Sequence, residues 1–131
     1  MKEELLKKIV SREESMPDNL IVGTDPATRV GSAVLRKGTG ILKRGTVLAK
    51  SSADALLVTL GTEAEESETL EAYGILTDDV DISADDVPAT IYIGGLFNAN
   101  RIIVADSYTM TENDKDTLRK YGIEIKAAFT N

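Results

Sequence analysis

The sequence contains neither cysteine nor histidine. Without cysteine there is no disulfide framework, no thiolate nucleophile and no cysteine-ligated metal. Without histidine, the commonest general base near neutral pH and the commonest transition-metal ligand are both missing. Any catalysis would have to use carboxylates, lysine, tyrosine or hydroxyl groups. The composition therefore argues against an enzyme, and we expect no cofactor.

Aromatic residues are scarce at 5% of the chain, and tryptophan is missing. Hydrophobic residues still make up 42% of the 131 residues, so we expect a single domain with a core of Val, Ile, Leu and Ala. No apolar run approaches the roughly 20 residues that span a bilayer. Charges interrupt the apolar positions of MKEELLKKIVSREES, unlike those of a secretory signal. We therefore expect a soluble protein, made in a cytoplasm, that makes no membrane contact.

Basic residues are missing from one stretch of the chain. Residues 51–100 carry eleven acids and no Lys or Arg, whereas residues 1–50 carry ten basic residues and six acids. Such asymmetry indicates either surfaces that meet different surroundings or simply solvated loops.

Short runs of Val, Ile, Leu and Thr, separated by Gly or Asp, predict several strands between residues 19 and 60. Further strands are expected at 72–77, 89–95 and 101–106, and an exposed acidic loop at 62–68. The predicted fold class is mainly β (a β-rich α+β domain), compact and resembling a small barrel or sandwich.

Two segments have helical character. Thr111 followed by Asp114 resembles a capping box, and Gly122 suits a helix C-terminus, so one helix is expected before a last strand at 123–127. Residues 2–14 have apolar positions at helical spacing and predict a short amphipathic helix that ends before Pro17.

Five aspartates precede the apolar run 89–93: Asp78, Asp79, Asp81, Asp85 and Asp86. A calcium loop starting at Asp79 fails, because Ala84 occupies the glycine position and Thr90 the final bidentate position. Sequence-adjacent pairs on a strand point to opposite faces, which disfavours a catalytic dyad. We interpret the cluster as solvated turns before a strand, and we expect no metal site.

The basic and glycine-rich stretches do not predict a nucleotide or nucleic-acid site either. GILKRGT (40–46) imitates a phosphate-binding loop, but the lysine required after Gly45 is missing. The doublets Arg36-Lys37 and Lys43-Arg44 lack aromatic stacking partners and are typical of a hairpin's solvent face. We expect no nucleic-acid partner.

Three segments in order carry a resemblance to a known family: GILKRGTVLAK (40–50), AYGILTDDVDISADDVPATIYIGGLFNANRIIV (72–104) and ENDKDTLRKYGIEIKAA (112–128). Together with NLIVGTD (19–25), they resemble the bacteriophage head decoration proteins typified by phage lambda's protein D. Members from phages and prophages of Gram-positive bacteria are the most similar.

The resemblance implies a structural virion protein without catalytic activity. It implies a homotrimer that binds the major capsid protein at local threefold axes of the expanded head and stabilises the head against internal DNA pressure. The protein would lie on the outer capsid surface, after assembly in the host cytoplasm. Phe97 and Asn98, after Gly94-Gly95, complete one family motif and are expected to serve packing and turn geometry.

The resemblance also implies an N-terminal arm. We assign residues 1–24 to this arm, mostly outside the core, and residues 25–131 to the β-rich domain. The arm is expected to add backbone hydrogen bonds to a capsid strand. The candidate capsid-binding residues are those of the matching segment: Asn19, Leu20, Ile21, Val22, Gly23 and Thr24.

The sequence leaves two alternative functions open. The first is a small-molecule or glycan-binding β module on the virion that attaches to a host, although six aromatic residues without tryptophan offer little platform for a sugar. The second is a carboxylate-dependent enzyme, which the missing histidine disfavours.

Overall fold

The computed structural model describes residues 18–127 of the chain, which form a mainly β structure with one helix, as predicted. The amphipathic helix predicted at 2–14 lies outside the described residues. The elements are β1 (Ile21–Gly23), β2 (Arg29–Leu35), β3 (Ile41–Leu42), β4 (Val47–Ser51), β5 (Leu57–Thr59), β6 (Leu70–Leu76), β7 (Val80–Asp81), β8 (Val87–Asn98), α2 (Glu112–Lys120) and β9 (Ile123–Lys126).

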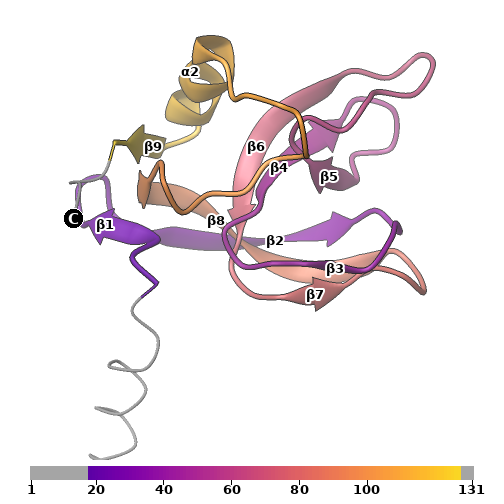
Figure 1. Ribbon diagram of the computed structural model, residues 1–131, viewed down its shortest axis with the longest axis horizontal. Coiled ribbons are helices and arrows are strands. Elements are labelled where there is room, and N and C mark those ends of the chain that lie inside the picture. Colours follow the sequence, from indigo (N-terminus) through magenta and orange to yellow (C-terminus); the bar gives the residue numbers. More distant parts are fainter. Residues whose placement is uncertain (1–17, 128–131) are drawn as a thin grey trace, which may run out of the picture.

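Five strands close into a small barrel. β8 pairs with β2, β2 with β5, β5 with β4, β4 with β6, and β6 again with β8. All these pairs are antiparallel except β2 with β5, which meet at the single pair Leu35 and Leu57. Closure leaves few free edges, which suits a domain built from short strands. The short pair β3–β7 lies beside the barrel (Figure 1).

β8 is long enough to take part in a second, smaller sheet. Its last residues pair with β1 on one side and with β9 on the other (Figure 1). The change from the barrel to this sheet falls at Gly94 and Gly95, where Gly95 has φ +141. A Cβ on Gly95 would lie 2.9 Å from the Phe97 ring, so only glycine fits this bend.

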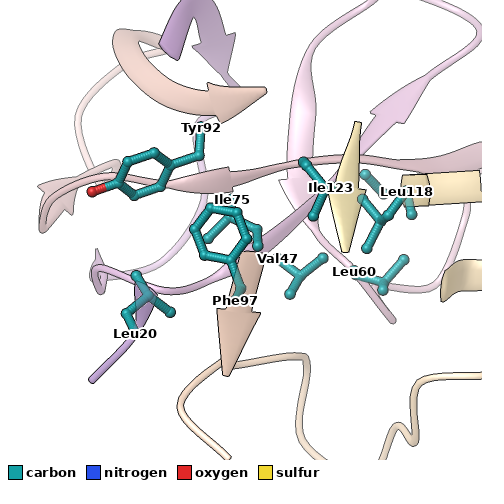
Figure 2. Packing of buried hydrophobic residues seen from close by; sticks show 10 residues of the cluster. Leu20, Val47, Leu60, Ile75, Tyr92, Phe97, Leu118 and Ile123 are labelled. Atoms are coloured by element: carbon teal, nitrogen blue, oxygen red, sulfur yellow. The ribbon is translucent and has the colours of Figure 1, made fainter. Parts of the chain in front are cut away.

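Two apolar clusters fill the domain. One comprises Leu35, Leu48, Leu57, Leu76, Ile82 and Ile91, from the barrel strands and the turn after β7. The other lies between the barrel wall and the small sheet with α2, as Figure 2 shows, and contains Leu20, Val47, Leu60, Ile75, Tyr92, Phe97, Leu118 and Ile123. Phe97 is fully buried and its ring centroid lies 5.2 Å from that of Tyr92. The prediction that Phe97 serves packing is confirmed.

The helix prediction is confirmed in detail. Thr111 caps α2, its side chain accepts the N–H of Asp114, and the Asp114 carboxylate accepts the N–H of Thr111. Gly122 follows the C-cap with φ +102. No helix within residues 18–127 is long and apolar enough to cross a membrane.

The strand predicted at 101–106 is wrong. Ile103 forms only an isolated bridge to Thr46, in which the Ile103 carbonyl accepts the N–H of Val47. Two residues later, the N–H of Ala105 donates to the carbonyl of Leu60, just after β5. The segment therefore crosses from one partner to another. Its Ile102 and Val104 side chains pack against the second cluster without a strand ladder, while Ile103 is 40% exposed.

Candidate functional site

The acidic cluster at 78–86 serves turns, as predicted. The carboxylate of Asp79 accepts the N–H of Arg44, and the carboxylate of Asp86 accepts the N–H of Lys37. Both donors belong to the loops on either side of β3, the strand that pairs with β7. Asp81 accepts the N–H and hydroxyl of Ser83, which lowers its pKa. Within residues 18–127, no group of three or more Asp or Glu side chains is arranged to hold a metal ion.

The acidic loop predicted at 62–68 is exposed except at its end, where Glu68 is buried. Its carboxylate accepts from Arg36 at 2.5 Å, from the Ser51 hydroxyl at 2.6 Å and from the N–H of Glu65 at 2.9 Å. These donors, Arg36 first, lower the pKa of Glu68 from 4.5 to about 2. The prediction that Arg36 belongs to a solvent face is therefore wrong, because it ties this loop to the barrel.

The middle of the segment Asn19–Thr24 is extended, as predicted, and forms β1, whereas Asn19 has φ +56 and Thr24 lies in a bend. The segment is part of the folded domain. β1 pairs antiparallel with β8 through Ile21 with Phe97 and Gly23 with Leu96. Leu20 is 1% exposed and belongs to the second apolar cluster. The expectation that this segment lies outside the core is wrong at Leu20, because its side chain fills space beside Phe97 (Figure 2).

β1 keeps one free edge. Within the described residues β1 is the last strand on its side of the sheet, so its outer backbone groups pair with no strand there. Val22 is half exposed, while Ile21 on the other face packs against the core. This arrangement offers a short row of backbone donors and acceptors with one apolar side chain beside it, the chemistry that an added strand requires.

Both residues before Leu20 are fastened to the domain, Asn19 to the end of β8 and Asp18 to the turn before β4. The Asn19 carbonyl accepts the side-chain N–H of Asn98 at 3.0 Å, and the Asn98 carboxamide oxygen accepts the N–H of Asn100. Asn98 thus has the turn role that its motif predicted. Asp18 forms an ion pair with Arg44 at 2.5 Å, and this hydrogen bond lowers the pKa of Asp18.

The comparisons with known proteins give one family. The chain matches the model for bacteriophage lambda head decoration protein D over residues 10–123. No curated protein matches the chain. The family is one of structural phage head proteins, and the matched range includes β1, the whole barrel and α2. The chain therefore belongs to the bacteriophage lambda head decoration protein D family.

Proposed function

We propose that the protein is a homotrimeric cement of the phage head. It binds the major capsid protein at local threefold axes on the outer surface of the expanded head and stabilises the head against the pressure of packaged DNA. It reaches the head from the host cytoplasm during assembly. The family match over residues 10–123 carries this proposal.

The capsid-binding element that we propose is β1 with the residues before it. Three features support it. The outer edge of β1 is unpaired within the described residues, Val22 is half exposed, and residues 1–17 join the domain at this point in the sequence. A capsid strand added to this edge would gain backbone hydrogen bonds, and Val22 would help to set its register.

Self-association is supported by the outer side of the barrel strand β2. Its side chains alternate, so that Val30, Ser32 and Val34 are exposed, and no charged residue lies between Arg29 and Arg36. Within the described residues, β2 pairs with β8 alone, except at Leu35, which also pairs with β5. Exposed strands usually carry charges or proline that prevent pairing, and β2 carries neither after Arg29. A trimer also strengthens capsid binding, because the first arm to dock raises the effective concentration of the other two.

The test is co-sedimentation of the protein with undecorated expanded heads of the same phage. The intact protein is expected to bind saturably, and Val22→Lys is expected to weaken binding while the domain stays folded. Ile103→Lys is the matched control, since Ile103 is as exposed as Val22 but lies outside β1. An intact protein that stays in the supernatant would rule out the capsid function.

A variant lacking residues 2–17 tests the remainder of the arm. It keeps Asp18, Leu20 and β1, so we expect a melting curve close to that of the intact chain and much weaker binding to heads. If this variant saturates the heads like the intact chain, binding lies within residues 18–131 alone, and residues 2–17 have no part in it.

A further inference from the structure

We propose that Arg44 is a positioning residue for capsid binding: by holding Asp18 against the barrel, it fixes the start of the segment 18–24 that carries the free edge of β1. The inference rests on the proposed capsid function and assigns a role in binding to two residues outside the candidate segment Asn19–Thr24.

The guanidinium of Arg44 joins three parts of the domain. Its Nε lies 2.5 Å from Asp18 Oδ2, and its Nη2 lies 3.5 Å from Asp18 Oδ1. Its Nη1 donates to the hydroxyl of Tyr92 at 2.7 Å and to the carbonyl of Thr77 at 3.0 Å. The planar fork is therefore used on both sides, toward the N-terminal segment and toward the barrel, which a lysine ammonium does not reproduce.

Two further contacts fix Arg44 itself. Its backbone N–H donates to Asp79 at 2.9 Å, and its guanidinium carbon lies 5.6 Å from the centroid of the Tyr92 ring. Tyr92 is a buried residue of the second apolar cluster. Arg44 thus connects Asp18 to a buried side chain of the barrel and not to another exposed surface group.

Asp18 transmits this restraint to the chain. Its Oδ1 accepts the N–H of Leu20 at 3.2 Å, which closes a turn immediately before the buried Leu20 side chain. Leu20 already anchors the strand by burial. The ion pair therefore acts on the chain directly before the buried Leu20 side chain and the free edge of β1.

The exposure of the pair decides between a stabilising role and a positioning role. The Asp18 side chain is 46% exposed and that of Arg44 28%. Pairs this open to water add little to folding stability, since solvent screens them. Fixing the segment that begins at Asp18 affects binding instead, because a segment that is already ordered loses less conformational entropy when it binds the capsid.

The experiment measures head binding and melting temperature for Asp18→Asn, Arg44→Gln and the double variant. Asp18→Asn keeps an oxygen for the Leu20 N–H and removes the carboxylate. We expect about threefold to tenfold weaker binding for each single variant, with the double variant no weaker than Arg44→Gln alone, because both changes break one contact. Asp18→Glu keeps a carboxylate and is expected to retain most of the binding. Arg44→Lys is expected to lose binding as Arg44→Gln does.

Arg119→Gln is the matched control. Arg119 also forms ion pairs, with Asp116 and Glu124, but it lies on α2. It is expected to bind heads like the intact protein.

The outcomes separate the two proposals. If the intact protein binds heads and Asp18→Asn binds equally well, the positioning role is wrong and the capsid function stands. Losses in binding that merely follow losses in melting temperature, or that add up in the double variant, also overturn it. If the intact protein does not bind, both proposals fail.

Discussion

Replacing Leu20 with alanine tests whether the start of the matched segment belongs to the folded domain. Leu20 is 1% exposed in the cluster that contains Phe97, Leu118 and Ile123. The Leu20 carbonyl also accepts the N–H of Asn98 at 2.8 Å. This bond holds the Leu20 backbone, and therefore its side chain, in place. The site has little freedom to collapse around a smaller residue.

The magnitude follows from what the substitution removes. Losing three buried carbon groups at about 0.8 kcal/mol each costs about 2.4 kcal/mol in transfer free energy. The cavity left behind brings the loss of unfolding free energy to about 3 kcal/mol. With an unfolding entropy of roughly 0.25 kcal/mol/K for a domain of this size, the melting temperature falls by about 12 °C.

The assay is thermal and urea unfolding followed by circular dichroism, at one fixed protein concentration because a trimer's stability depends on concentration. Val22→Ala is the control, since Val22 lies in β1, two residues after Leu20, but is half exposed. Its loss of unfolding free energy should stay below about 1 kcal/mol. A Leu20→Ala protein within about 0.5 kcal/mol of the intact chain would refute the reasoning and return residues 19–24 to a free arm.

Three further changes have distinct expected results. Asp86→Asn keeps the acceptor for the Lys37 N–H and should change stability by less than about 0.5 kcal/mol, whereas Asp86→Ala should cost about 1 kcal/mol, and calcium should shift the melting temperature of neither. Because the pKa of Glu68 is lowered from 4.5 to about 2, its contribution to stability is complete above pH 4.5 and disappears as the pH falls toward 2. Glu68→Gln should therefore melt below the intact protein at pH 7, and the difference should narrow by pH 2; an unchanged difference would contradict the assignment. Val30→Glu should shift the mass measured by light scattering from trimer toward monomer without unfolding, while Ile41→Glu, equally exposed on β3, should not.

Local signals in the sequence predicted the elements that are determined locally. The Thr111/Asp114 capping box and Gly122 define α2 almost to the residue, because helix ends are set by neighbours three or four positions away. The aspartates of 78–86 were likewise assigned to turns from their short-range preferences.

Contacts between distant segments could not be predicted from the residues alone. Arg36 meets Glu68 across 32 positions and Arg44 meets Asp18 across 26, so neither pair leaves a pattern in the sequence. The sequence alone therefore predicts a solvent face for both arginines. The strand prediction for 101–106 failed for a related reason: Ile102 and Val104 pack on the cluster, but the backbone bonds to different segments at Ile103 and at Ala105.

The candidate site was identified by resemblance, and its environment came from the fold. An apolar segment such as Leu20–Val22 reads the same whether it pairs with its own domain or with a partner, since both require alternating side chains. In the structure Leu20, just before β1, and Ile21 of β1 contact the core, and the outer edge of β1 is unpaired within the described residues.

The most direct test of the central claim is a binding isotherm of the intact protein on undecorated expanded heads, combined with an electron cryomicroscopy reconstruction of the saturated particles. We expect saturation at three copies for each local threefold position, with density for a trimeric knob on the outer surface and β1 at its capsid-facing side. No binding, or binding without threefold density, would contradict it.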